Sequence, residues 1–293
     1  MNVPYSAAKE DLFYPARRGA FFSTGRPTSD AALCAEMARL AYARQEPDFA
    51  FDRDQILKVI AGIGFQECKF FENPTGPQGQ GSHAFLAIDD TAKLAVLSFR
   101  GTDADDPTDL IDDIKTSLQP WTGIGKVHSG FAGALTQIWD QVQKGLSTVA
   151  EARLLFTGHS LGAAMATVAA SLQLPSSLYT FGSPRVGNSE FVAALQRRQL
   201  DNHRYVDCCD VVTRVPPEGL LEYTHVGRPF YIDLARAVQE RDPADEYMKE
   251  DRDAAEVRYI EDYAWRIGNV ALRPLADHAP INYVWPVSAA SGA

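Results

Sequence analysis

The residues best placed to do chemistry in this chain are a serine and the two glycines that flank it. Residues 158–162 read Gly-His-Ser-Leu-Gly, with Ser160 at the centre. An apolar run at 154–156 leads into this pentapeptide and a segment rich in Ala, Leu and Met follows it, which predicts a strand, a sharp turn and a helix. Glycine is expected at 158 and 162 because side chains there would collide with the helix or with neighbouring strands. Such a turn is typical of a nucleophilic serine.

A helix that begins directly after Ser160 also provides a place for negative charge. The first backbone N–H groups of a helix have no acceptor within it, and the helix dipole is positive at that end. The N–H of Leu161 is therefore the first expected donor to the oxyanion that forms when a serine attacks a carbonyl group.

A serine is a weak nucleophile until a base takes its proton, so a histidine and an orienting carboxylate must come from elsewhere in the fold. In folds with this turn, the chain order is serine, acid, histidine. Three histidines follow Ser160. His278, in the polar stretch LADHAPINYV, is the preferred base, and His225, near the start of a predicted strand, remains the alternative. His203 is expected at the surface.

Two aspartates compete for the role of the acid. Asp210 ends the predicted strand RYVDCCD and begins the loop that follows it. Asp207 lies inside that strand, where its side chain can point to either face of the sheet. Asp210 is preferred and Asp207 stays open, because spacing alone does not separate them.

The elements around these residues predict an α/β fold, in which a mainly parallel sheet is covered by helices on both faces. Two helices, at 28–45 and 51–64, precede a strand at 64–73 and a hairpin formed by 83–90 and 93–102. Helices and strands then alternate: helix 130–149, strand 153–158, helix 161–174, strand 177–182, helix 189–198 and strand 204–210.

The whole chain, 1–293, is expected to form a single domain, with an N-terminal helical segment at 1–63 and a charged helical insertion at 233–263. Of its residues, 45% are hydrophobic and 23% are charged, which is typical of folded globular proteins. The formal net charge of −10 argues against nucleic acid as a partner, because its phosphates are bound by clustered Lys and Arg.

Nothing in the sequence approaches the roughly 18 apolar residues of a membrane-spanning helix. The N-terminus has no basic start followed by an apolar core, which a secretory signal would need. The cysteines, Cys34, Cys68 and the pair Cys208-Cys209, show no zinc-binding spacing and are expected to be reduced, buried thiols. These features predict a cytoplasmic protein without a metal.

Six segments together resemble the fungal-type, or class 3, lipase family of the α/β-hydrolase fold. They are LSFRGT, VHSGF, FTGHSLGAA, TFGSPRVGN, DVVTRVPP with YTHVG after it, and DHAPINYV, and they span about residues 83–285 in the order of the family. The resemblance implies Ser160 as nucleophile, Asp210 as acid and His278 as base. It also implies that Thr102 supplies a second oxyanion donor opposite Leu161, the alternative being a plain turn residue.

The implied reaction is acyl transfer, in which the serine attacks an ester and water then hydrolyses the acyl-enzyme without a cofactor. The chain departs from the family after Thr102, where many lipases carry an amphipathic lid. Residues 103–121 open with four aspartates and place four apolar residues on one helical face: Leu110, Ile111, Ile114 and Leu118. That face would cover an acyl pocket or form an ordinary buried stripe.

An acidic lid would resist adsorption to anionic lipid, although transient contact with a lipid surface remains compatible with the sequence. The substrates to consider are therefore triacylglycerols, soluble carboxylic esters, phospholipid acyl bonds, and polymer or aromatic esters. A hydrolase-fold protein that binds lipid or a partner without turnover is the alternative from another class. The insertion at 233–263 would shade the entrance of the pocket or be a solvated helix.

Overall fold

The computed structural model describes residues 3–22, 25–45, 49–73, 81–101, 117–217, 222–239 and 243–292. Its centre is an eight-stranded sheet in the order β1-β2-β3-β6-β7-β9-β11-β12. The strands from β3 to β11 run parallel, whereas β1, β2 and β12 pair antiparallel at the two edges. Their bounds are β1 Glu67–Asn73, β2 Ser82–Asp89, β3 Leu94–Phe99, β6 Arg153–His159, β7 Ser177–Phe181, β9 Asn202–Asp207, β11 Pro229–Ile232 and β12 Val238–Gln239.

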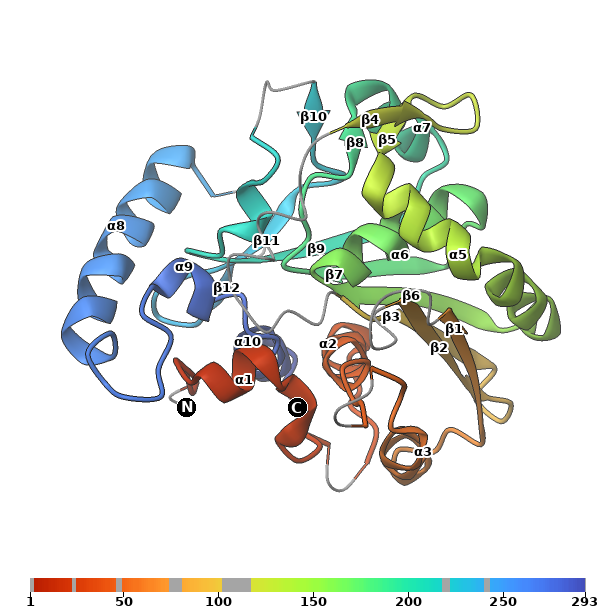
Figure 1. Cartoon of the computed structure of the whole chain (residues 1–293), viewed down its shortest axis with the longest axis horizontal. Helices are drawn as coiled ribbons and strands as arrows, with labels where there is room; N and C mark the ends of the chain where they lie inside the picture. Colours follow the sequence, from red (N-terminus) through yellow and green to blue (C-terminus); the bar gives the residue numbers. More distant parts are fainter. Residues whose placement is uncertain are drawn as a thin grey trace.

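Helices lie on both faces of this sheet, with α5, α6 and α7 above it and α1, α2, α3 and α10 below it in Figure 1. A small second sheet, in the order β10-β8-β5-β4, stands beside α7. The helices are α1 Lys9–Phe13, α2 Asp30–Leu40, α3 Arg53–Gly62, α5 Ser129–Leu146, α6 Leu161–Leu172, α7 Ser189–Arg197, α8 Asp245–Asp262, α9 Arg273–Ala276 and α10 Ile281–Ala290. The short strands are β4 Leu118–Pro120, β5 Lys126–His128, β8 Gly187–Asn188 and β10 Tyr223–Thr224, and 3₁₀ turns occupy Pro15–Arg17, Ser147–Val149 and Val212–Arg214.

Successive side chains of a strand point to opposite faces of the sheet, which explains why a hydrophobic core lies on each face. In β3, Leu94 and Val96 belong to the core cluster that includes α2, α3 and α10. Ala95 and Leu97 belong to the cluster that includes α5, α6 and α7. The predicted α/β-hydrolase fold, with a mainly parallel sheet flanked by helices on both faces, is confirmed.

Several predicted bounds are wrong in informative ways. Strand β9 ends at Asp207 instead of continuing to Asp210, because the chain turns there and the Asp210 N–H donates to the Asp207 carbonyl at 3.1 Å. Leu118 lies in β4, paired with His128, and therefore does not belong to a helical stripe. The other three apolar residues of that stripe, 110, 111 and 114, lie outside the described residues, as do the aspartates between 103 and 109.

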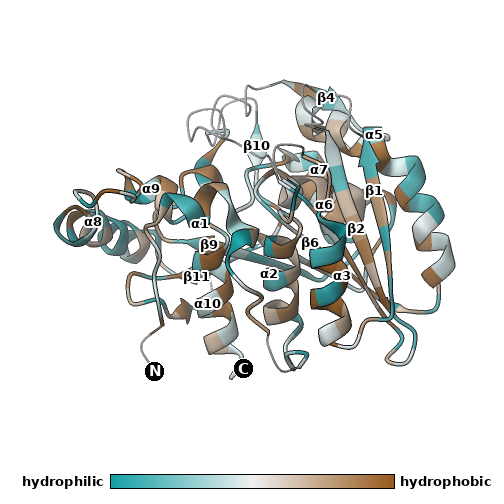
Figure 2. Ribbon diagram, turned by 60° about the horizontal axis from the view of Figure 1, so that its bottom comes forward, coloured by the Kyte–Doolittle hydropathy of each residue, from teal (hydrophilic) through white to brown (hydrophobic). Residues whose placement is uncertain are grey.

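Within the charged stretch 233–263, β12 extends the sheet and α8 forms a helix of 18 residues. Ala255 and Tyr259 are the buried residues of α8. Figure 2 shows the mainly hydrophilic colour of this helix, which stands at one end of the molecule. Among the described residues, no helix combines the length and the apolar character needed to cross a membrane.

The turn between β6 and α6 depends on two glycines, as the sequence predicted. A Cβ added at Gly158 would lie 2.3 Å from the carbonyl carbon of Gly162. A Cβ added at Gly162 would lie 2.2 Å from the carbonyl oxygen of Phe99 in β3. Both contacts are with backbone, which cannot move aside cheaply, so the steric need for glycine at these positions is confirmed.

Replacing Gly162 with alanine should therefore destabilise the protein by at least about 3 kcal/mol, because overpacking against backbone exceeds the usual cost of an added methyl group. The matched control is Gly133→Ala in α5, where an added Cβ meets nothing within 4 Å. That change should stabilise the protein by about 0.5–1 kcal/mol, since alanine is the better helix former. Denaturant unfolding measures both free energies, and equal effects of the two substitutions would contradict the packing argument.

Candidate active site

Ser160 occupies the turn between β6 and α6 in a conformation that is unusual for a residue with a side chain. Its backbone dihedrals are φ 59° and ψ −127°. The Ser160 N–H donates to the Phe181 carbonyl of β7 at 3.0 Å, which ties the turn to the neighbouring strand. A non-glycine residue at positive φ costs free energy that the surrounding packing must offset, and such residues cluster at functional sites. The serine is only 3% exposed.

The structure brings Ser160, His278 and Asp210 into one hydrogen-bonded chain. His278 Nε2 lies 2.9 Å from Ser160 Oγ, and His278 Nδ1 lies 2.8 Å from Asp210 Oδ2. Because a carboxylate only accepts, Nδ1 carries the proton and Nε2 is left to accept from the serine hydroxyl. This is the geometry of a nucleophile, a base and an orienting acid. The three residues come from the ends of β6 and β9 and from the link between α9 and α10.

The alternatives that the sequence left open are engaged elsewhere. His225 Nε2 lies 2.7 Å from the Thr213 carbonyl, and burial, with the charge of Arg204 next, holds the pKa of His225 well below its usual value. His203 stacks on Tyr179, with ring centroids 4.5 Å apart. Neither ring reaches the serine as His278 does.

Asp210 receives hydrogen bonds on both carboxylate oxygens. Val212 N–H donates to Oδ1 at 2.8 Å, and the Tyr283 hydroxyl donates to Oδ2 at 2.5 Å. The same hydroxyl accepts from the Asp207 N–H at 3.2 Å. Burial, followed by the charge of Asp210, raises the pKa of Tyr283 well above its usual value, so the phenol keeps its proton. Sequence reasoning missed Tyr283, although it lies in the DHAPINYV segment.

A second histidine, His159, packs behind the base. Its ring centroid lies 4.5 Å from that of His278, and the Tyr42 hydroxyl is 2.8 Å from its Nδ1. Burial, with the charge of His278 next, keeps the pKa of His159 well below its usual value, so the ring stays neutral. Gly182, at φ +60°, also packs against Asp210 and His278, since a Cβ there would lie 2.9 Å from Asp210 Oδ2 and 3.1 Å from His278 Nδ1. These contacts lock the imidazole from two sides.

Two buried ion pairs hold the segments that carry the acid and the base. Asp207 binds Arg236 Nη1 through both oxygens, at 2.9 and 2.7 Å, with the two side chains 0% and 5% exposed. Burial raises the pKa of Asp207, and the Arg236 charge opposes that rise. Asp277, next to His278, pairs with Arg273 at 3.2 Å and accepts from the Tyr5 hydroxyl at 2.7 Å. Asp207 is therefore engaged by Arg236, and it is Asp210 that the structure places against His278.

Of the two expected oxyanion donors, one lies among the described residues. Leu161 is the first residue of α6, so its N–H has no acceptor within the helix. Thr102 lies outside the described residues. Gly101, directly before it, packs tightly on the serine turn, since an added Cβ would lie 2.8 Å from the His159 carbonyl oxygen and 2.1 Å from the Tyr42 hydroxyl.

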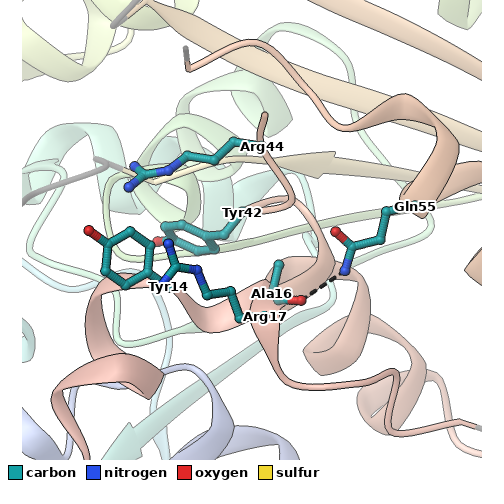
Figure 3. A pocket seen from close by; sticks show the side chains of 6 residues that line it. All are labelled: Tyr14, Ala16, Arg17, Tyr42, Arg44 and Gln55. Carbon is teal, nitrogen blue, oxygen red and sulfur yellow. Dashed lines mark hydrogen bonds between the residues drawn. The ribbon is translucent and has the colours of Figure 1, made fainter. Parts of the chain in front are cut away.

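A cavity of about 230 Å³ is lined in part by Tyr42 (Figure 3). The guanidinium of Arg17 lies over the Tyr14 ring, 3.7 Å from its centroid, and Arg44 reaches the same ring at 5.2 Å. None of the residues that line this cavity is a member of the Ser160, His278 and Asp210 chain. They are Tyr14, Ala16, Arg17, Tyr42, Arg44 and Gln55.

Cys208, Cys209 and Asp277 are the potential metal ligands that gather among the described residues. The Asp277 carboxylate is already committed to Arg273 and to Tyr5. The hydrogen bond with Cys209, together with burial, raises the pKa of the Cys208 thiol well above its usual value. Metals bind the thiolate, so this cluster is better suited to internal hydrogen bonding than to holding an ion.

Comparison with known proteins identifies relatives among lipases. The family model described as lipase (class 3) matches residues 96–220. A secreted mono- and diacylglycerol lipase of Fusarium solani is 32% identical over 162 residues, which cover 52% of this chain and 48% of that protein. A triacylglycerol lipase of Arabidopsis thaliana is 29% identical over 210 residues, covering 52% of this chain and 40% of that one. The chain thus spans less than half the length of either relative.

The predicted cytoplasmic location is wrong on this comparison, because the Fusarium solani relative is a secreted lipase. The prediction drew partly on the reduced cysteines. Cys34 and Cys208 are buried, and burial raises the pKa of the Cys34 thiol well above its usual value. A buried, protonated thiol reacts poorly in any compartment, so these residues carry no information about location.

Two solved structures share the fold. The lipase of Rhizopus microsporus var. chinensis matches with a TM-score of 0.55 and 25% identity, covering 82% of this chain and 85% of that chain. Lipase II of Rhizopus niveus matches with a TM-score of 0.52 and 26% identity, covering 66% and 76%. With the family model and the curated relatives, these similarities lead to one conclusion: residues 96–220 of this chain belong to the class 3 lipase family, and the chain has the α/β-hydrolase fold of that family.

Proposed function

We propose that this protein is a serine hydrolase that cleaves acyl esters of glycerol lipids. The observation that carries the proposal is the chain from Ser160 through His278 to Asp210, which starts at a strained strand-to-helix turn. Membership of the class 3 lipase family supports the same chemistry. The Fusarium solani and Arabidopsis thaliana relatives, a mono- and diacylglycerol lipase and a triacylglycerol lipase, suggest the substrate class.

In the proposed reaction, Ser160 Oγ attacks the ester carbonyl while its proton passes to His278 Nε2. The imidazolium that forms is stabilised by Asp210, which stays ionised. Negative charge on the carbonyl oxygen is taken up by the N–H of Leu161 and by that of Thr102, which follows Gly101 in the sequence. His278 then donates the proton to the leaving alcohol, and water, activated by the same imidazole, releases the acid and restores the serine.

Tyr283 acts in this proposal as a positioning residue, because it touches the acid and not the ester. Its hydroxyl bridges the Asp207 N–H and Asp210 Oδ2, and so fixes the oxygen that receives the His278 proton. It also draws charge from that oxygen. Without it, the carboxylate would turn more freely and would hold the protonated imidazole more tightly.

We also propose that the chain is organised as one hydrolase domain and that it acts outside the cell, as its secreted Fusarium solani relative does. The N-terminal segment supports one domain, since Ser6 exchanges two hydrogen bonds with Asn282 of α10, at 2.9 and 2.7 Å. Ala8 forms a β-bridge with Asn269, beyond the end of α8. The N-terminal segment is therefore tied both to α10, which follows His278, and to the loop that follows α8.

Purified protein should react covalently with a fluorophosphonate probe, because the probe is attacked only by an activated serine. Ser160→Ala should abolish both the labelling and the hydrolysis of a short-chain p-nitrophenyl ester. In-gel fluorescence and the absorbance of p-nitrophenol measure the two effects. Labelling that persists in Ser160→Ala, or folded wild-type protein that stays unlabelled, would overturn the proposal.

Tyr283→Phe should lower kcat for the same ester by about 10-fold or more with little change in KM, since one charge-assisted hydrogen bond is lost. The acid limb of the pH profile of kcat/KM should move to higher pH, because the protonated imidazole gains stability. Tyr231→Phe is the control, as Tyr231 donates to Asp251 at 2.9 Å away from the triad. If Tyr283 has a purely structural role, Tyr283→Phe will lower stability but leave the pH profile in place, as Tyr231→Phe does.

A further inference from the structure

The end of α8 and the loop to α9 present large apolar side chains to solvent. We call this surface the α8–α9 corner and define it by five residues: Val257, Ile260, Trp265, Ile267 and Leu272. Their exposed fractions are 59%, 66%, 71%, 106% and 61%. The other exposed large apolar residues in the described part of the chain are less exposed, such as Leu57 on α3 at 41% and Leu174 after α6 at 37%. Clustered exposure of this kind marks an interaction site more often than single residues do.

Hydrogen bonds hold the loop in the shape that exposes these side chains. The Val270 N–H donates to the Ala7 carbonyl at 2.8 Å, and the Lys9 N–H donates to the Gly268 carbonyl at 2.9 Å. The Tyr259 hydroxyl donates to the Val270 carbonyl at 2.5 Å. The loop therefore has a fixed conformation that buries Val270 and turns its neighbours outward.

The same loop has a buried side that strengthens this point. Tyr259, Val270 and Ala7 form a small core cluster, against which Tyr5 and Tyr263 pack. Some apolar residues of this segment are thus buried in a core. Trp265 and Ile267 lie outside it and are exposed, in the loop that follows the lower end of α8 and leads to α9 (Figure 1). Their exposure is built into the local structure.

We propose that the α8–α9 corner is a docking surface for a neutral or zwitterionic lipid surface. The inference rests on the proposed function, since such a surface would be the source of the ester substrate. The side chain of Ile267, at 106% exposure, is uncovered by neighbouring residues. A rigid protein partner would need a matching pocket for it, whereas fluid acyl chains close around it. Trp265 has Arg266 beside its ring at 5.4 Å, a combination suited to the boundary between lipid tails and water.

The negative charge of the protein determines which kind of lipid surface it would bind. Helix α8 carries eight acidic and three basic residues, and the whole chain has a formal net charge of −10. Anionic headgroups would be repelled by this field, whereas phosphatidylcholine or a droplet of neutral glyceride would not. The apolar side chains would supply the binding free energy, because each one buried in the acyl region leaves water.

The corner is joined to the catalytic segment through α9. Leu272 immediately precedes this helix, whose Arg273 pairs with Asp277, the neighbour of His278. The Pro274 carbonyl of the same helix accepts from the Val211 N–H at 3.1 Å, next to Asp210. The corner therefore borders the segment that holds Asp210 and His278 in place.

The test compares wild type with the double variant Trp265→Ser, Ile267→Ser in flotation with vesicles of ether-linked phosphatidylcholine, which an esterase cannot cleave. Wild type should float with the vesicles. The double variant should partition at least about 10-fold less, because two large side chains no longer leave water. Leu57→Ser, an exposed apolar residue on α3, is the matched control and should bind as wild type does.

Hydrolysis of a soluble short-chain ester is measured in parallel and should be the same in wild type and in both variants, since none of the changed residues touches the triad. If the double variant floats as well as wild type, or if Leu57→Ser loses as much binding, the proposal is overturned. Stronger binding to added anionic phosphatidylglycerol would overturn the charge argument.

Sedimentation velocity tests the alternative that a second copy of the chain occupies the corner. A dimer that dissociates in the double variant, together with the absence of flotation in wild type, would show that the corner joins two copies and would overturn the lipid proposal. If wild type floats but hydrolyses no ester, the docking surface stands and the proposed function fails. The two proposals are therefore tested separately.

Discussion

The buried ion pair between Asp207 and Arg236 is the interaction on which the arrangement of the site depends. Both side chains are shielded from water, so removing either partner would leave an uncompensated charge in the interior, at a cost of about 3–5 kcal/mol. The pair fixes the end of β9, and the turn after it brings Asp210 to face His278. The peptide N–H of Asp207 also holds Tyr283, so one residue organises both the backbone and the hydrogen bonds around the acid.

The serine turn imposes a second constraint of a different kind. Its positive φ is unfavourable for a serine, and the close contact of α6 with β6 and β3 helps to maintain it, together with the hydrogen bond from Ser160 to β7. That contact requires glycine at 158 and 162. In return, the side chain of Ser160 stands at the start of α6, where a backbone N–H is available to an oxyanion. Strain in the turn and catalytic geometry therefore have the same structural cause.

Beyond the family core, the N-terminal segment and the region from α8 to α9 share one small hydrophobic cluster and several backbone hydrogen bonds. These elements lie outside residues 96–220, the part of the chain that the family model matches. They contact the segment of His278 through Tyr5 and Ser6. This periphery therefore supports the segment of His278 from one side while presenting apolar side chains to solvent on the other, which links a surface feature to the placement of that histidine.

The sequence by itself determined the local features of this protein: the strand, turn and helix around Ser160, the need for its glycines, the alternation of strands and helices, and the chain order of serine, acid and histidine. It left Asp207 and Asp210, and His225 and His278, as alternatives. It also missed Tyr283, Gly182 and the strand at Leu118. Only the tertiary structure shows which of these residues lie together, because a hydrogen bond between residues 68 or 118 positions apart depends on how distant strands and helices pack, which no local spacing records.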